Sequence, residues 1–399
     1  MIPSIRKAYN TAFSEEKYRE FIDDLANVYP GQLDFRVAET PVFVPKDFTN
    51  KILDACENIV DIITDPKFKE LTNKAIPEKL KVHGENDHSH FICFDFGICI
   101  NDSGEYEPQL IEMQGFPSLF CYEALLPEVH RKHFPAPNGF DKYLGGHNKQ
   151  SYIQLLKDII IKDQKPENVI LLEIFPEKQK TRIDFFATEE YLGIKMVCLT
   201  KIIKERKKIF YMKDGKKTEI KRIYNRLIFD DLSQQPPEVQ EKGKLMFEEL
   251  EVEWIPHPNW FYRISKYTLP FIRHPYVPQT YFLNEVKQIP GDLENYVLKP
   301  LFSFAGQGVV IDVKKEDIEK VKDPENWILQ RKVKYADVIE TPDVPAKAEI
   351  RIFYFWKDGM QRPVPANNLA RLSKGKMIGV RYNKDKEWVG GSFCLFEAP

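Results

Sequence analysis

The segment that most constrains the fold spans residues 296–313, where two apolar stretches flank a short loop. The first stretch ends in Lys299 and Pro300, the loop contains Gly306 and Gly308, and a β-branched stretch follows. This order predicts a strand, a loop and a second strand. A lysine at the end of a buried strand provides a fixed cation, and glycines let backbone N–H groups approach an anion. The segment therefore predicts a phosphate-binding loop.

The position of these glycines excludes two common nucleotide sites. A P-loop (Gly-x4-Gly-Lys-Ser/Thr) and a Rossmann turn (Gly-x-Gly-x-x-Gly) both open a helix, whereas the glycines here lead into a β-branched run. Lys299 has an alternative interpretation as an edge-strand lysine in water. The later apolar strand that ends at Gln330 favours a ligand contact, because its backbone and amide groups can lie along an adenine edge.

A second group of polar residues lies far earlier in the chain. Asp95 belongs to a predicted strand, 90–100, and Glu112 and Gln114 end the strand that returns after the turn at 101–104. Glu112 and Gln114 are two residues apart and share a strand face, which Asp95 can join across the hairpin. Two carboxylates and an amide oxygen suit Mg²⁺. Solvent-facing strand ends are the alternative, but the apolar neighbours of Glu112 favour a site.

Composition restricts the partners of this chain. Among 399 residues, 43% are hydrophobic, 30% are charged and the net charge is −2, which gives no general case for nucleic acid or anionic membrane. No apolar run approaches the ~18 residues of a membrane span, and the N-terminus lacks a signal-peptide core. The basic stretch 201–222 also contains acidic residues and reads as a solvated hairpin. Six scattered cysteines without a Cys-x-x-Cys pair indicate a reducing compartment, so we expect a cytoplasmic protein.

The remaining pattern predicts alternating helices and strands. Residues 169–199 read as strand, helix and strand, which predicts a small parallel sheet. The other predicted elements are helices at 14–30, 47–75 and 123–132, a hairpin at 207–229 and strands at 37–44, 108–113, 327–333 and 348–356.

Three further sets of polar residues have two interpretations each. Glu349 and Arg351 share a strand face and either contact a metal or phosphate or form a surface salt bridge. Arg371 precedes a glycine-bearing tail and is a candidate to hold a carboxylate or an acyl phosphate. The histidine cluster (His83, His88, His90) suggests zinc, but its spacing matches no common zinc pattern and favours a polar loop.

Several of these motifs resemble one protein family. Residues 297–301, with the glycine loop, look like the phosphate loop of the ATP-grasp superfamily, and 265–267 resemble its lysine segment that meets the nucleotide. Residues 110–119, with Glu123, are similar to the Glu-x-Asn-x-x-x-Pro-Thr-Ser-Leu segment of glutathionylspermidine synthetase-like proteins. In that branch the metal-binding strands precede the nucleotide loop, a circular permutation of the usual order, and the order is the same here. The resemblance covers about residues 85–130 and 165–399.

The resemblance implies an α+β or α/β protein with a circularly permuted ATP-grasp fold and a small α/β pre-ATP-grasp domain. The implied regions are 85–160 (metal-binding strands), 165–235 (the α/β domain) and 254–399 (nucleotide-binding part). Residues 1–84, outside the resemblance, are expected to form a helical region that covers the site or shapes the substrate pocket. The implied Mg²⁺ ligands are Asp95, Glu112 and Gln114. The implied ATP contacts are Lys266, Lys299, Ser303, Ala305, Gly306, Gln307, Gly308 and Gln330, and Arg351 and Arg371 are the candidates to stabilise the transferring group.

The implied function is an ATP- and Mg²⁺-dependent ligase that joins a small-molecule or peptide carboxylate to an amine through an acyl phosphate. The alternatives are another phosphoryl transfer on the same fold and a non-catalytic ATP-binding role. The chain departs from the family pattern at three places. Gln114 replaces an asparagine, Cys93 replaces an arginine that would clamp charge, and 115–118 shorten the Asp-Thr-Pro-Thr core.

Overall fold

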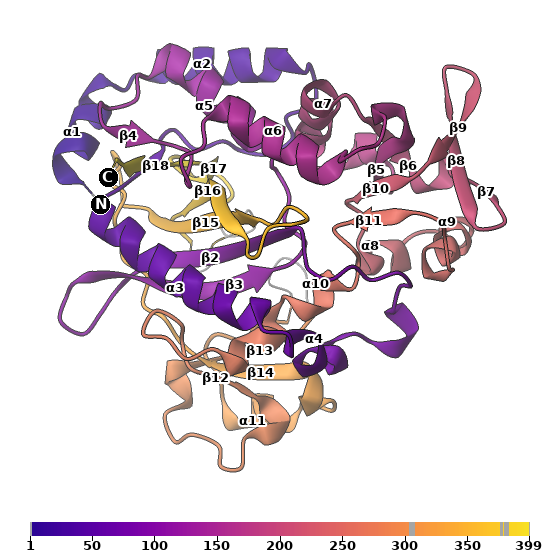
Figure 1. The fold of residues 1–399 in the computed structure, drawn as a ribbon. Helices are drawn as coiled ribbons and strands as arrows, with labels where there is room; N and C mark the ends of the chain where they lie inside the picture. Colours follow the sequence, from indigo (N-terminus) through magenta and orange to yellow (C-terminus); the bar gives the residue numbers. More distant parts are fainter. Residues whose placement is uncertain (1, 303–307, 376–377, 379–382, 399) are drawn as a thin grey trace.

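A five-stranded sheet lies at the centre of the computed structural model, which describes residues 2–302, 308–375, 378 and 383–398 (Figure 1). Its strand order is β17-β16-β15-β2-β3, and all neighbouring pairs are antiparallel. The strands are β2 (Phe91–Ile100), β3 (Tyr106–Gln114), β15 (Lys347–Phe355), β16 (Val364–Ser373) and β17 (Gly390–Ser392). The sheet thus joins the predicted metal-binding hairpin to the last part of the chain.

Both faces of strand β2 are buried. Its even-numbered side chains, such as Phe94 and Phe96, pack in one core with α3 (Lys46–Thr64), and its odd-numbered side chains Phe91 and Cys93 pack in a second core with α6 (Lys149–Ile160). This double burial explains the nearly continuous apolar run of the strand, Phe-Ile-Cys-Phe-Asp-Phe-Gly-Ile-Cys-Ile. Asp95 is the one charged residue in it, so its carboxylate requires partners inside the protein.

A three-stranded antiparallel sheet lies below the central sheet in Figure 1, with the order β12-β14-β13. Its strands are β12 (Thr280–Phe282), β13 (Tyr296–Pro300) and β14 (Trp327–Arg331), and α11 (Lys315–Glu319) packs nearby. The expectation of a second strand at 309–313 is wrong, because only Val310 forms a bridge, with Leu298. The chain then leaves the sheet and turns into α11, which begins after Lys314.

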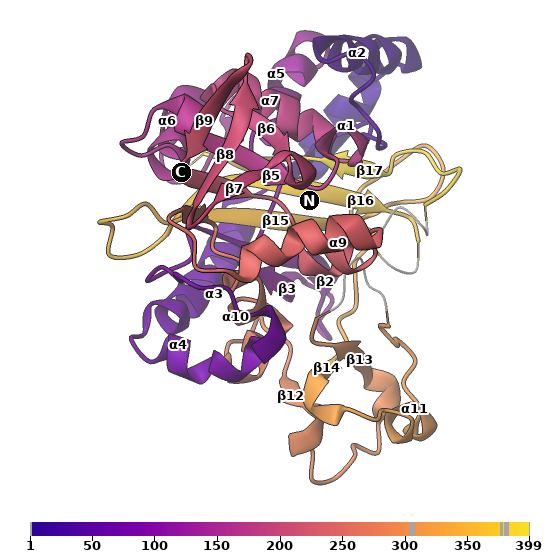
Figure 2. The same cartoon turned by 90° about the vertical axis from the view of Figure 1, so that its right-hand side faces the viewer.

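A parallel sheet with the order β11-β10-β5-β6 forms the side of the molecule shown at the right of Figure 1. It contains β5 (Val169–Glu173), β6 (Lys195–Cys198), β10 (Arg222–Asn225) and β11 (Glu253–Ile255), with α7 (Arg182–Leu192) between β5 and β6. The predicted β-α-β unit is therefore confirmed. The predicted hairpin at 207–229 is only half correct, because its second arm divides at Lys221. Residues before that point form β9 (Lys216–Ile220), which pairs with β8 (Lys208–Lys213). Together with β7 (Ile203–Glu205) these strands form a small projecting sheet (Figure 2). Residues after that point form β10, which joins the parallel sheet.

The first two helices of the chain lie above the central sheet in Figure 1. Helix α2 (Glu15–Val28) contacts α5 (Tyr122–His133), and the short strand β1 (Val42–Val44) pairs in parallel with β18 (Cys394–Glu397), which also pairs with β4 (Phe140–Asp141). The predicted helix at 47–75 is shorter than expected, since α3 stops at Thr64 just before Asp65-Pro66. Other helices are α1 (Pro3–Ala12), α4 (Phe68–Leu71), α8 (Phe229–Ser233), α9 (Pro237–Gly243) and α10 (Trp260–Arg263).

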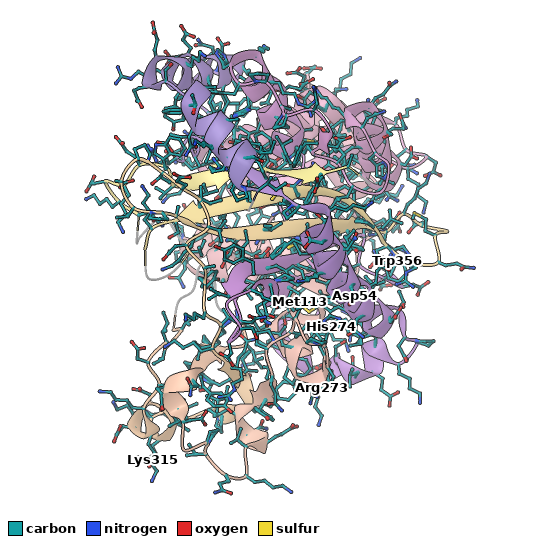
Figure 3. All side chains as sticks on the ribbon, turned by 90° about the vertical axis from the view of Figure 1, so that its left-hand side faces the viewer. Asp54, Met113, Arg273, His274, Lys315 and Trp356 are labelled. Carbon is teal, nitrogen blue, oxygen red and sulfur yellow. The ribbon has the colours of Figure 1, made fainter. Side chains whose placement is uncertain are left out.

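The segment that leads into the lower, three-stranded sheet is held against α3 by a side-chain contact. His274 Nε2 lies 3.0 Å from the Asp54 carboxylate of α3, and Figure 3 places this pair near Met113 of β3. The segment between α10 and β12 is thereby fixed beneath the hairpin that carries Glu112. No helix of the described residues is long and apolar enough to cross a membrane.

Candidate functional site

Two arginines hold the Asp95 carboxylate. Arg351 donates from Nε to Oδ1 at 2.6 Å and from Nη2 to Oδ2 at 2.7 Å, and Arg371 Nη2 donates to Oδ2 at 2.8 Å. The register explains the arrangement, because Arg351 lies opposite Asp95 in the pairing of β15 with β2. Asp95 is completely buried, which would raise its pKa, but Arg351 and Arg371 outweigh burial and the pKa lies below its ordinary value. The interpretation of Arg351 as part of a surface salt bridge is therefore wrong, since its ion pair is buried.

The predicted metal ligands Asp95, Glu112 and Gln114 are brought together on one face of the sheet. Asp95 lies opposite Glu112 and Cys93 opposite Gln114, and the Gln114 amide donates to Glu112 Oε1 at 2.7 Å. Both Asp95 oxygens, however, already accept hydrogen bonds from guanidinium groups. Among the residues that the structure describes, no arginine donates a hydrogen bond to Glu112 or Gln114, so the oxygens of these two side chains are available to a cation.

Glu349 adds a third carboxylate to this face. It lies next to Arg371, with 3.0 Å between Glu349 Oε2 and Arg371 Nη2, and its Oε1 accepts a hydrogen bond from the Tyr335 hydroxyl. Burial raises the pKa of Glu349 above its ordinary value, and the neighbouring Asp95 and Glu112 carboxylates add to the rise although Arg371 opposes it. Carboxylate and amide oxygens gathered in this way are a donor set that fits Mg²⁺.

Lys299 faces these carboxylates from the lower sheet. Its ammonium donates to Gln330 Oε1 at 2.6 Å and to the Ile111 carbonyl at 3.3 Å, and Gln330 in turn donates to Thr280 Oγ1 at 3.1 Å. The predicted proximity of Lys299 and Gln330 is confirmed, because β13 and β14 are neighbours. The bond to Ile111 joins the lower sheet to β3, so the cation lies at the junction of the two sheets.

A second ammonium lies close to the first. Burial lowers the pKa of Lys299 to about 8, with Lys266 contributing to the fall while Glu112 and Glu349 oppose it. Burial also lowers the pKa of Lys266, again opposed by Glu112. A half-buried lysine beside a buried one is stabilised in its charged form when an anion binds between them. A phosphate group has the required charge.

The centre of the predicted phosphate loop lies outside the described residues. Ser303, Ala305, Gly306 and Gln307 belong to that gap, and Gly308 lies at its far end with a φ of 73°.

The departure from the family pattern at 115–118 has a structural reason. A Cβ atom at Gly115 would come within 2.4 Å of the Trp260 carbonyl oxygen, so helix α10 packs here only against glycine.

Two charged residues of the neighbouring parallel sheet were not predicted as site residues. Arg226 follows β10, donates to the Pro117 carbonyl at 2.7 Å and packs its guanidinium over Phe116, 4.7 Å from the ring centre. Glu173 ends β5, and burial raises its pKa to about 8. Both lie at the carboxyl ends of adjacent parallel strands where the strand order reverses, the usual place for a ligand in such sheets. The sequence does place Arg226 and Glu173 at the ends of predicted strands. It does not show that these two strands, β5 and β10, are neighbours in the sheet, so the two residues could not be assigned to one site.

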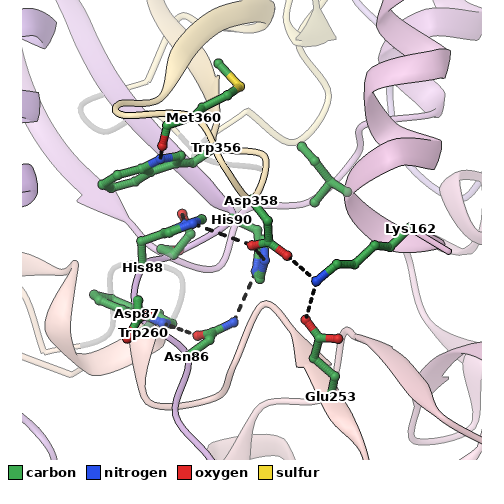
Figure 4. A network of polar contacts seen from close by, with 12 residues as sticks. Asn86, Asp87, His88, His90, Lys162, Glu253, Trp260, Trp356, Asp358 and Met360 are labelled. Carbon is green, nitrogen blue, oxygen red and sulfur yellow. Dashed lines mark hydrogen bonds and ion pairs between the residues drawn. The ribbon is translucent and has the colours of Figure 1, made fainter.

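Two residues of the histidine cluster, His88 and His90, belong to a network of hydrogen bonds and ion pairs at the start of β2 (Figure 4). His90, Glu253 and Asp358 present ligand-type atoms within 4.8 Å of one another, and His88 Nε2 is 3.6 Å from Asp358. Lys162 binds the same Asp358 carboxylate at 2.7 Å. These contacts connect four segments that are far apart in the chain.

The hydrogen bonds around His90 oppose zinc binding at this cluster. The Trp260 indole donates to Asn86 Oδ1 at 2.7 Å, which fixes the amide so that its NH₂ group faces His90 Nδ1 at 3.3 Å. His90 therefore carries its proton on Nε2 and donates to Asp358 at 3.1 Å. A metal on Nε2 would need the proton on Nδ1, against the amide donor. The interpretation as a polar loop fits this geometry.

Comparison with known proteins supports the fold. No family model matches the chain, and no curated protein matches its sequence. A solved structure of a glutathione synthetase-like effector from Globodera pallida, in its apo form, is similar over 98% of this chain and 99% of that one, with a TM-score of 0.59 and 10% sequence identity. The chain thus shares a mixed α/β architecture with a glutathione synthetase-like protein along nearly its full length.

Proposed function

We propose that this protein is an ATP- and Mg²⁺-dependent ligase that joins a carboxylate to an amine, built on a circularly permuted ATP-grasp fold. One observation carries the proposal: the half-buried Lys299 and the buried Lys266 face a cluster of carboxylate and amide oxygens on the central sheet. The lysines suit the phosphates and the oxygens suit a divalent cation. The structural similarity to a glutathione synthetase-like protein supports the same class of reaction.

The roles of individual residues follow from their positions. Lys299 and Lys266 neutralise phosphate oxygens, and Gln330, next to Lys299, orients that ammonium. Glu112 and Gln114 hold Mg²⁺, which when bound neutralises charge on the phosphates. Asp95 fixes Arg351 and Arg371 rather than contacting the ion, because its oxygens are engaged by both. Arg371 is half-buried and is the arginine that offers donors toward a transferring group.

The proposed reaction has two steps. A substrate carboxylate attacks the γ-phosphorus of ATP, which gives an acyl phosphate and ADP. An amine then attacks the acyl carbon and releases phosphate and a proton, leaving an amide. The protein contributes mainly positioning and charge neutralisation, since the chemistry needs no protein nucleophile. Arg226 and Glu173, at the edge of the parallel sheet, are placed to contact the substrates.

Nucleotide binding is expected to weaken as the pH rises above 8. The pKa of Lys299 is about 8 in the free protein, so its ammonium is lost through this range and the phosphate contact with it. Burial lowers this pKa most and Lys266 lowers it further, whereas Glu112 and Glu349, which also face the ammonium, raise it. Above pH 8 the affinity for ATP should fall by up to about tenfold per pH unit. Titration calorimetry between pH 7 and 9.5 measures the slope.

The matched variant for this pH prediction is Lys299→Arg, because a guanidinium stays charged throughout the range. We expect its ATP affinity to vary little between pH 7 and 9.5. A wild-type affinity that is flat over the same range would contradict the assignment of Lys299 to the phosphates.

The ligase proposal is tested by an ADP-release screen against amino acids, short peptides and polyamines, offered singly and in carboxylate–amine pairs. A ligase sustains ADP release beyond the first turnover only when both partners are present. Mass detection should then find a product lighter than the sum of its parents by one water. ADP release that needs no amine, or a phosphorylated product, would instead indicate another phosphoryl transfer.

A second candidate function is nucleotide binding without ligase turnover. The engagement of Asp95 by two arginines favours it, because one carboxylate that the sequence assigned to the metal is occupied. Tight Mg²⁺-dependent ATP binding combined with no product for any pair in the screen would support this role.

A further inference from the structure

Glu349 lies on the same face of the central sheet as Asp95, on the neighbouring strand β15 and two residues further along. It is opposite Gly97 on β2 and opposite Arg371 on β16, while Asp95 is opposite Arg351. Both carboxylates are buried, and both interact with Glu112. Glu349, like Glu112, raises the pKa of Lys299, so both glutamates stabilise the charged form of this lysine.

The partners of the two carboxylates differ. Asp95 accepts three charged hydrogen bonds from two guanidinium groups, which use both of its oxygens. Glu349 accepts a neutral hydrogen bond from Tyr335 and shares Arg371 with Asp95. An ionised carboxylate has about four lone-pair sites, so Asp95 retains about one after its three bonds, whereas Glu349 retains about two after its contacts with Tyr335 and Arg371. Glu349 is therefore the better placed of the two as a metal ligand.

Tyr335 reaches Glu349 because Gly97 leaves room for its ring. A Cβ atom at position 97 would lie 2.7 Å from Tyr335 Cε1, closer than two carbon atoms approach in proteins. Tyr335 follows β14 and is anchored by a bridge to Cys99, two residues from Gly97. The hydroxyl is thus held in place by the strand that also carries Asp95.

We propose that Glu349, oriented by Tyr335 and Gly97, is the second carboxylate of the magnesium site in place of Asp95. In this arrangement Glu112, Gln114 and Glu349 are the ion's protein ligands, Tyr335 is a positioning residue, and Asp95 fixes the two arginines. The inference rests on the proposed nucleotide function and specifies which residues of that site meet the ion. Residues that hydrogen-bond to a metal ligand, as Tyr335 does to Glu349, change the metal affinity by about 10- to 100-fold when they are removed.

The test measures how ATP affinity depends on Mg²⁺ concentration in the full chain. We compare wild type, Glu349→Gln and Tyr335→Phe by titration calorimetry at a series of Mg²⁺ concentrations and in EDTA. Tyr335→Phe should raise the half-saturating Mg²⁺ concentration about tenfold, and Glu349→Gln should raise it further. The affinity of Tyr335→Phe for ATP in EDTA should equal that of wild type, a result that general loss of structure would not give.

The matched control is Tyr211→Phe, which removes another part-buried hydroxyl. Tyr211 belongs to β8 of the distant projecting sheet, and its hydroxyl donates to the Glu167 carbonyl at 3.0 Å. Its Mg²⁺ dependence should equal that of wild type. Mn²⁺ bound in the presence of ATP, counted by electron paramagnetic resonance, gives a second readout that needs no turnover. Gly97→Ala should reproduce Tyr335→Phe, and thermal midpoints identify any variant that fails to fold.

The outcomes separate two failures. A wild-type chain whose ATP affinity does not depend on Mg²⁺ overturns the proposed function and this assignment with it. A wild-type chain with normal Mg²⁺ dependence, together with unchanged dependence in both Tyr335→Phe and Glu349→Gln, overturns the assignment alone.

Discussion

Replacing Asp95 by alanine is expected to lower the free energy of unfolding by about 3 to 5 kcal/mol. The substitution leaves Arg351, which is 8% exposed, as a buried cation without its bidentate partner, and it frees one donor of Arg371. The cost comes mainly from this uncompensated charge and less from the lost contacts. Urea denaturation followed by far-ultraviolet circular dichroism measures the change.

The control for Asp95 is Asp292→Ala, which removes another aspartate paired with an arginine, Arg331, but on the surface. Exposed ion pairs contribute little to stability, so its urea midpoint should match that of wild type. A midpoint for Asp95→Ala that also matches wild type would contradict the buried ion-pair network. It would then reopen the assignment of Asp95 to the metal.

Replacing Lys299 by alanine is expected to weaken ATP binding by about 10- to 100-fold. A charge-assisted hydrogen bond contributes about 1.5 to 3 kcal/mol, and each 1.4 kcal/mol corresponds to a factor of ten in affinity. The thermal midpoint should change little, because the same substitution removes the cost of burying an ammonium. Titration calorimetry with ATP and Mg²⁺ at pH 7 measures the affinity.

Lys332 provides the matched lysine for this experiment. It lies two residues after Gln330 near the end of β14, but its ammonium is at the surface and pairs with Asp312. Lys332→Ala should bind ATP as wild type does. Equal affinities for Lys299→Ala and wild type would remove Lys299 from the nucleotide site.

Local patterns predicted the parts of the site that neighbouring segments build. The pairing of Asp95 with Glu112 follows from a hairpin of two apolar strands around the turn at 101–104, since both strands and the turn are short-range signals. The same reasoning wrongly predicted a strand from the β-branched run 309–313. Only Val310 pairs, because strand propensity does not decide whether a partner strand is available.

The contacts that decide the chemistry were not predictable in this way. Arg351 lies 256 positions from Asp95, and no local pattern indicates that β15 pairs with β2 rather than with another strand. Tyr335 lies in an irregular segment without periodicity, and its importance depends on the room left by Gly97. The sequence therefore indicated which residues carry charge but not which charges neutralise one another.

The central sheet has a consequence for how this protein is made. Strands β2 and β3 end at Gln114, and their partner β15 begins only at Lys347. At about 5–20 residues per second, a ribosome needs on the order of ten to fifty seconds to supply that partner. During that interval the apolar edge of β2, with a lone aspartate in it, has no strand to pair with. Nascent chains are thus expected to depend on chaperones until β15 emerges.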